Sequence, residues 1–135
     1  MRAHAFWIAW ATVLVCGSAI AETGDCGDAR NTVEMNACAD KELTAADADL
    51  NKAYRKVLAR VPSVDAPAPY DAKGYEAALR AAQRAWVAYR DADCKGVVPF
   101  EWGGGTGATA AVLGCLTEKT KARTKDLNES SFGPQ

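Results

Sequence analysis

The chain has 135 residues, 49% of them hydrophobic, and its 16 Lys and Arg residues nearly balance 17 Asp and Glu residues, for a net charge of −1 at pH 7. This length predicts one modest domain, and the near-neutral charge gives no general electrostatic reason to bind nucleic acid or anionic lipid. The single histidine is His4, so the rest of the chain has no imidazole for a catalytic triad, general acid–base chemistry or a histidine-containing metal site.

Residues 1–21 are predicted to be a cleaved signal peptide. Arg2 supplies a short positive region, residues 5–15 form an almost uninterrupted apolar run, and Ala-Ile-Ala at residues 19–21 matches the small-x-small cleavage pattern. A retained transmembrane helix needs about 20 consecutive apolar residues, and this run is shorter. Removing the signal also removes His4 and leaves residues 22–135 as a single domain with a net charge of −2.

Cys16 offers a minority alternative, in which the chain is a bacterial lipoprotein acylated on this cysteine. Small residues normally precede a lipidated cysteine, whereas Val15 stands here. With either kind of processing we expect an extracytoplasmic protein, periplasmic or secreted, without a stable membrane span in its mature part.

The first long helix is predicted from Thr32, a residue type that caps helix N-termini, to about Arg60. Its apolar residues recur at steps of three and four. Three prolines then interrupt the pattern, because proline lacks an amide hydrogen and fixes its backbone angle, so residues 61–71 should form a loop between helices. The apolar positions are Leu43, Ala46, Leu50, Tyr54, Val57, Leu58 and Val61.

A second, clearly amphipathic helix is predicted over residues 73–93. We expect Gly96, Pro99 and the glycine triplet 103–105 to interrupt helix formation, and residues 96–102 are the one candidate for a short hairpin. The apolar stripe of the helix consists of Tyr75, Leu79, Ala82, Trp86 and Tyr89.

A third helix is predicted after the glycine loop, with Thr106 or Thr109 as its cap. It carries apolar residues as far as Leu127, and residues 130–135 are expected to be a frayed tail. No stretch longer than four residues alternates like a half-buried strand. The prediction is therefore an all-α fold, in which three helices with short connections pack as a small antiparallel bundle.

Four cysteines follow the signal: Cys26, Cys38, Cys94 and Cys115. An even number of cysteines in an exported chain indicates disulfides, and the spacing lacks the C-x-x-C of a zinc knuckle or thioredoxin-like site. The sequence leaves three pairings open, of which local geometry favours Cys26–Cys38 and Cys94–Cys115. Each would close a short loop worth about 3 kcal/mol in the chain-entropy model.

Polar residues interrupt the apolar faces of the first two helices. Gln83 and Arg90 share a face with Trp86 on the second helix, while Asp47 and Asn51 share a face on the first. A charge in the interior is tolerated only when it is hydrogen-bonded. We therefore expect Asp47, Asn51, Gln83 and Arg90 to form a structural polar network between the helices.

Two blocks of sequence carry a family resemblance: DADLNKAY at residues 47–54 and QRAWVAYRDADC at residues 83–94. With the further matches below, the chain resembles the LprI-like lysozyme inhibitor family of exported bacterial proteins from residue 26 to residue 127. The resemblance implies a helical, disulfide-bonded extracytoplasmic domain, and it implies lysozyme or another envelope protein as the partner. The further matches are Met35-Asn36-Ala37-Cys38, the glycine loop 103–105, Cys115, and Thr120, Arg123 and Leu127.

The candidate partner-binding loop consists of Pro99, Phe100, Glu101 and Trp102. Lysozyme inhibitors generally block the active-site cleft, where two carboxylates flank the scissile sugar bond. The second predicted disulfide would brace this loop, and its two aromatic rings could enter a sugar-binding groove. In the competing interpretation the same aromatics cover the open end of the bundle.

The alternative function is a cell-envelope binding or structural module without inhibitory activity, which could bury Phe100 and Trp102 where an inhibitor must expose them.

We expect no enzymatic activity, cofactor or metal, because no set of residues converges like an active site. The glycine triplet lacks the Lys-Ser/Thr of a P-loop, and the basic run at residues 119–125 lacks interleaved aromatics, so nucleic acid is not an expected partner. The sequence does not determine the oligomeric state.

Overall fold

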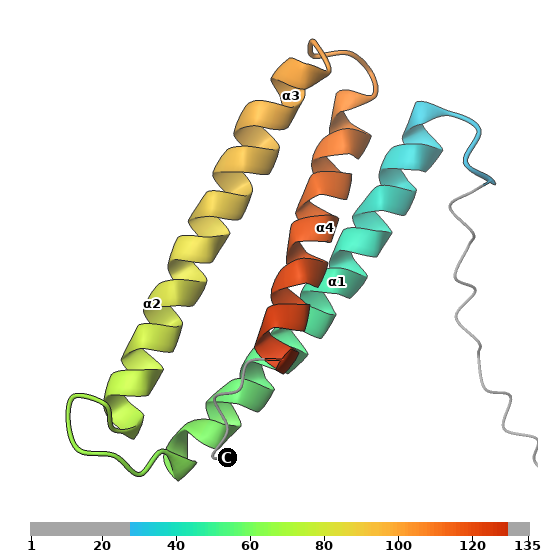
Figure 1. Cartoon of the computed structure of the whole chain (residues 1–135). Helices are drawn as coiled ribbons and strands as arrows, with labels where there is room; N and C mark the ends of the chain where they lie inside the picture. The colour runs from blue at the N-terminus through green and yellow to red at the C-terminus, as the bar shows by residue number, and fades with distance from the viewer. Residues whose placement is uncertain (1–27, 130–135) are drawn as a thin grey trace, which may run out of the picture.

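The computed structural model describes residues 28–129 (Figure 1). This part of the chain is helical and contains no strand, which confirms the predicted all-α class with three principal helices. The predicted signal peptide, residues 1–21, and the predicted tail, residues 130–135, lie outside the described residues. The elements are α1 (Thr32–Arg60), the 3-10 turn η2 (Val61–Ser63), α2 (Ala72–Asp91), the π-helical turn η3 (Ala92–Val97), α3 (Val98–Glu101) and α4 (Ala108–Glu129).

Helices α1 and α4 form the closest pair of the fold. Successive long helices run antiparallel, so α1 and α4 run in the same direction and lie side by side (Figure 1). Their seam contains small residues such as Ala46, Ala53 and Thr120, and the distance between packed helices depends on the side chains at the contact. The buried residues of the two helices are Ala46, Leu50, Ala53, Val57, Leu116, Thr117, Thr120 and Leu127.

Helix α2 packs on this pair through large side chains. Tyr75, Leu79 and Trp86 contact the core that α1 and α4 build, yet no residue of α2 is fully buried. Aromatic side chains keep a helix backbone farther from its neighbours than alanine or threonine do, which accounts for the wider spacing of α2 in Figure 1. Tyr89, the last residue of the predicted stripe, is exposed and stacks with Lys119.

Asn31, and not Thr32 as predicted, caps α1. The Asn31 side chain accepts a hydrogen bond from the amide of Glu34 at 3.0 Å, and the Glu34 carboxylate accepts one from the amide of Arg30 at 2.8 Å. This reciprocal arrangement is related to the capping box. Asparagine caps at least as well as threonine, so the helix starts with Thr32 as its first helical residue.

The prediction that Gly96 and Pro99 interrupt the second helix is wrong, and residues 96–102 do not form a hairpin. The helical path continues from α2 through η3 into α3. In the wider turn η3, the amide of Val98 donates to the carbonyl of Asp93, five residues earlier. Pro99 lies in the first turn of α3, directly after the π-helical turn.

The glycine triplet ends α3, as predicted, by a defined mechanism. Gly103 and Gly104 have φ angles of 57° and 68°, in the left-handed region that glycine adopts without steric cost. The amide of Gly104 donates to the carbonyl of Pro99 at 3.0 Å, and that of Gly103 to the carbonyl of Phe100 at 3.1 Å. These two bonds form a Schellman motif, which fixes the direction in which the chain leaves the helix.

Helix α4 begins at Ala108, directly after Gly107, so neither predicted cap is correct. Thr106 lies in the preceding turn and Thr109 lies inside the helix. Gly107 stands where the indole ring of Trp102 covers the backbone, since a Cβ atom on this glycine would come within 2.5 Å of the ring. The close approach of an aromatic ring, and not a capping side chain, explains the residue at this position.

The predicted disulfide Cys94–Cys115 is confirmed and joins η3 to α4, with the two Cα atoms 5.5 Å apart. Asp93 lies beside the two sulfur atoms, but sulfurs bonded to each other offer no thiolate ligand to a metal. Only this disulfide lies wholly within residues 28–129. Cys38 is also disulfide-bonded, but Cys26 lies outside the described residues, so the pairing Cys26–Cys38 stays a prediction.

Replacing Gly74 by alanine is expected to destabilise the start of α2. The amide of Gly74 donates to the capping carboxylate of Asp71 at 2.8 Å, and a Cβ atom on Gly74 would collide with the carbonyl oxygen of Pro69. Overpacking of this kind typically costs about 1–3 kcal/mol, measurable by urea unfolding. The matched control is Gly114→Ala in α4, where nothing lies within 4 Å of the new methyl group and where we expect a gain of about 0.5–1 kcal/mol. Equal effects at both positions would contradict the predicted collision.

Candidate functional site

The segment Pro99, Phe100, Glu101 and Trp102, called here the aromatic tip, forms α3 and its C-terminal cap. The Phe100 residue is 85% exposed and Trp102 is 54% exposed. Figure 1 places α3 at the same end of the bundle as the start of α1. The structure thus exposes both aromatic residues on the end of the helical bundle and does not fold them over it.

Other apolar residues are exposed at the same end. Val97 lies in η3 next to the aromatic tip, and Val33 and Met35 lie in the first turn of α1. Together with Phe100 and Trp102 they make up five of the eight large hydrophobic residues that are exposed within residues 28–129. A concentration of exposed apolar side chains on one part of a surface is typical of an interaction site.

Three features hold the aromatic tip in one conformation. The Schellman motif fixes the chain at Gly103 and Gly104, and the Trp102 indole rests on Gly107. One helical turn before the tip, the fully buried Cys94 is bonded to α4. A binding surface that is rigid before contact loses less conformational entropy when it binds.

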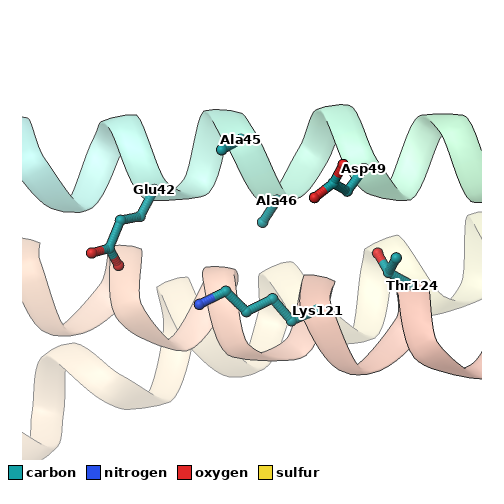
Figure 2. Close-up of a pocket in the computed structure, with 6 residues that line it drawn as sticks. All are labelled: Glu42, Ala45, Ala46, Asp49, Lys121 and Thr124. Carbon is teal, nitrogen blue, oxygen red and sulfur yellow. The ribbon is translucent and has the colours of Figure 1, made fainter. Parts of the chain in front are cut away.

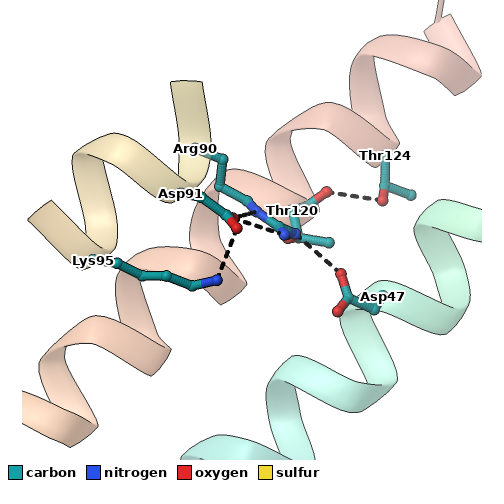
Figure 3. A network of polar contacts seen from close by, with 6 residues as sticks. All are labelled: Asp47, Arg90, Asp91, Lys95, Thr120 and Thr124. Atoms are coloured by element: carbon teal, nitrogen blue, oxygen red, sulfur yellow. Dashed lines mark hydrogen bonds and ion pairs between the residues drawn. The ribbon is translucent and has the colours of Figure 1, made fainter. Parts of the chain in front are cut away.

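Arg90 forms the centre of a polar network between the three long helices (Figure 3). Its Nη1 atom donates to Oδ1 of Asp47 on α1 at 3.2 Å and to the hydroxyl of Thr120 on α4 at 3.0 Å. Its Nε and Nη2 atoms both contact Oδ1 of Asp91 at 3.0 Å. The guanidinium also lies 5.1 Å from the centroid of the Trp86 ring. With 13% of its side chain exposed, Arg90 has the hydrogen-bond partners that a largely buried charge requires.

Asp91 links this network to solvent. Its second oxygen contacts Nζ of Lys95 at 2.7 Å. The hydrogen bond from Lys95, together with that from Arg90, lowers the pKa of the Asp91 carboxyl below its ordinary value of 3.8. Asp91 therefore remains ionised in mildly acidic solution.

The substitution Asp91→Asn is expected to lower the free energy of unfolding near neutral pH and to have little effect in strong acid. The folded-state pKa of Asp91 is lowered, so its stabilising contribution is fully present above the unfolded-state pKa of about 3.9. This contribution is lost as the pH falls through the lower folded-state value. Urea unfolding of both proteins between pH 2 and pH 7 measures the difference, and a difference that does not change with pH would contradict this assignment.

The other two predicted network residues do not meet Arg90. Gln83 accepts a hydrogen bond from Nε of Arg123 at 3.1 Å, so it joins α2 to α4 in a separate contact. Asn51 is exposed, because the spaced position of α2 leaves that side of α1 only partly covered. Thr120 and Arg123 were not predicted to take part, although both belong to the sequence matches that carry the family resemblance.

A shallow groove of about 380 Å³ runs along the seam of α1 and α4 (Figure 2). Its floor contains Ala45 and Ala46, and charged groups of both signs line its walls. The one hydroxyl among the lining residues, that of Thr124, donates to the carbonyl of Thr120 at 2.9 Å and so serves the helix itself. The lining residues are Glu42, Ala45, Ala46, Asp49, Lys121 and Thr124.

The fold and the exposed tip define a small, disulfide-braced helical protein that presents a rigid apolar surface at one end. The family model named Lysozyme inhibitor LprI matches residues 24–127. The chain therefore belongs to the LprI family, as the sequence resemblance implied. This family is named for inhibition and not for catalysis, which agrees with the expectation of a protein without enzymatic activity.

Among curated proteins, the chain is similar to Uncharacterized protein R02472 of Rhizobium meliloti (strain 1021). The two are 43% identical over 108 residues, which cover 78% of this chain and 77% of the relative. No solved structure matches the chain. Among the helices within residues 28–129, none has the length and apolar character needed to cross a bilayer.

Proposed function

We propose that this protein inhibits lysozyme by inserting the aromatic tip into the active-site cleft of the enzyme. The observation that carries the proposal is the exposure of Phe100 and Trp102 on a support braced by the Cys94–Cys115 disulfide. Membership of the LprI family supplies the class of target. The extracytoplasmic location that the predicted signal peptide implies, and the second disulfide Cys26–Cys38, are parts of the same proposal.

The tip has the chemistry of an occluding group. A lysozyme cleft binds a chain of sugar rings, and two catalytic carboxylates flank the bond that is cleaved. An aromatic side chain held rigidly in that cleft excludes substrate without any covalent step. Large aromatic side chains at the centre of an interface are also the residues that most often dominate binding energy. Phe100 and Trp102 meet both requirements because both are exposed at the end of α3, where the Schellman motif fixes the chain and Gly107 supports the Trp102 indole.

Charge near the tip favours a cationic partner. The first three turns of α1 carry three carboxylates against one lysine, and Glu101 adds an exposed carboxylate within the tip itself. Lysozymes are largely cationic, so opposite charges would accelerate the encounter and orient this end of the bundle toward the enzyme. The carboxylates at this end of α1 are Glu34, Asp40 and Glu42.

The test is a titration of muramidase activity for lysozymes of several classes with the oxidised, purified protein. Dose-dependent inhibition of at least one class at stoichiometric concentrations is the expected result. Absence of inhibition for every class would reject the proposal and favour the alternative, a cell-envelope binding or structural module.

A further inference from the structure

The charges of α1 are separated along its length. The first part, as far as Asp49, is strongly acidic, whereas the last eleven residues carry four cations and no carboxylate. The near-neutral composition conceals this separation, because the two halves cancel in the net charge. The four cations are Lys52, Arg55, Lys56 and Arg60, called here the basic end.

The basic end is a continuous surface. Lys52, Lys56 and Arg60 follow one another at steps of four, and Arg55 lies beside them, so all four project from neighbouring positions of the helix. All four are exposed, and none of them takes part in the ion pairs described for residues 28–129. Their positive charge is therefore available to a ligand.

The helix dipole does not account for this cluster. The dipole favours cations only within the last turn of a helix, a position that Arg60 occupies. Lys52 lies two turns earlier. Lys52 and Lys56 instead line a second groove of about 380 Å³, together with Asn128 of α4 and one carboxylate, Asp49. Two ammonium groups and a side-chain amide in one open groove suit a phosphate group.

An exposed aromatic residue accompanies the cations. Tyr70 is 77% exposed in the loop between η2 and α2, at the end of the bundle where α1 finishes (Figure 1). Tyrosine is typical of the boundary between lipid and water, where its ring sits at the level of the headgroups. Cations are attracted to anionic lipid headgroups, and the exposed ring supplies a group that a soluble polyanion would not use, so we take a lipid surface as the ligand.

We propose that the basic end docks on the surface of an anionic phospholipid membrane, with a headgroup phosphate between Lys52 and Lys56 and with Tyr70 at the interface. The basic end begins about 30 Å along α1 from the end that carries the aromatic tip. Docking through the basic end therefore leaves Phe100 and Trp102 remote from the docked surface. The two ends then have separate tasks, one holding the protein at a membrane surface and the other remaining open to a partner.

The experiment is co-sedimentation of the oxidised protein with vesicles of phosphatidylcholine alone or with one quarter phosphatidylglycerol, at 50 and 150 mM NaCl. We expect binding to the anionic vesicles only, weaker at the higher salt concentration. One cation near an anionic leaflet changes the partition coefficient about fivefold, so Lys52→Gln with Lys56→Gln should lower it about 25-fold. The matched control, Lys95→Gln with Lys121→Gln, removes the same charge elsewhere and should change it less than twofold.

Three results would overturn the proposal. The first is no preference for anionic vesicles at 50 mM NaCl, and the second is an equal loss of binding in the two double variants. The third is binding of soluble polyphosphate as tight as that of vesicles, with no effect of Tyr70→Ser on vesicle binding, which would indicate a general polyanion site. Muramidase inhibition measured on the same variants separates the two ends, because the basic-end variants should inhibit like the unmodified protein.

Discussion

Replacing Phe100 and Trp102 together by alanine is expected to weaken lysozyme inhibition by roughly 100-fold or more. Truncation of a central aromatic anchor typically costs 2 kcal/mol or more, and each 1.4 kcal/mol changes the affinity tenfold. Phe100 and Trp102 are 85% and 54% exposed, and neither residue belongs to the buried core, so the helical bundle should still form when both rings are removed, although the contact of Trp102 with Gly107 is lost. The inhibition constant against a sensitive lysozyme measures the effect, and circular dichroism checks that the variant is folded.

Two further variants test whether the loss belongs to the aromatic tip. Tyr70→Ala removes an equally exposed aromatic residue from the opposite end and should leave the inhibition constant unchanged. Gly107→Ala places a methyl group against the indole of Trp102, so it should displace the ring and weaken inhibition by an intermediate factor. Inhibition that survives loss of both tip residues in a folded variant would move the inhibitory surface elsewhere on the protein.

The helices were predictable because their signals are local. The three- and four-residue spacing of apolar positions located α1, and the stripe on α2 identified the residues that contact the core, Tyr75, Leu79 and Trp86. The continuation through Gly96 and Pro99 was not predictable by the same rules. There, tertiary anchoring by Cys94 and a π-helical turn outweigh the local preference of glycine and proline against helix.

The polar contacts were predictable only where helical spacing alone determines them. The spacing placed Asp47 and Arg90 on facing sides, and the structure brings them together at 3.2 Å. It could not show that Thr120 of the distant helix α4 shares the same guanidinium, because this depends on the parallel pairing of α1 with α4. The exposure of Asn51 depends on the spacing of α2, which is a consequence of side-chain size at the core and not of any pattern in α1.

The separation of charge between the two ends of the bundle was also not predicted from the sequence composition. The net charge of the whole chain is only −1, because the acidic residues at one end of the bundle offset the basic residues at the other. Because α1 alone spans about 43 Å, several times the Debye length of about 8 Å at physiological ionic strength, each end acts on its surroundings independently. The composition therefore gave no reason to expect lipid binding. The reason lies in the location of Lys52 and Lys56 near one end of a long helix.

Removing the disulfide with Cys94→Ala and Cys115→Ala is expected to lower the free energy of unfolding by about 3 kcal/mol. The two cysteines are 21 residues apart, and the chain-entropy model assigns about 3 kcal/mol to a loop of this size. For a chain of this length such a loss should lower the melting temperature by about 11 °C. Thermal and urea unfolding of the oxidised proteins measure both quantities. Reduction of the unmodified protein also breaks the bond of Cys38, so it should destabilise the fold at least as much as the double substitution.

The same variant separates stability from function. Below its melting temperature the variant keeps Phe100 and Trp102, but the brace between η3 and α4 that holds their support is gone. If rigidity before binding contributes to inhibition, the inhibition constant should rise by about tenfold, less than on loss of the aromatic rings themselves. An unchanged melting temperature would contradict the stabilising role of the disulfide, whereas an unchanged inhibition constant in a folded but less stable variant would show that the Schellman motif and Gly107 are sufficient to position the tip.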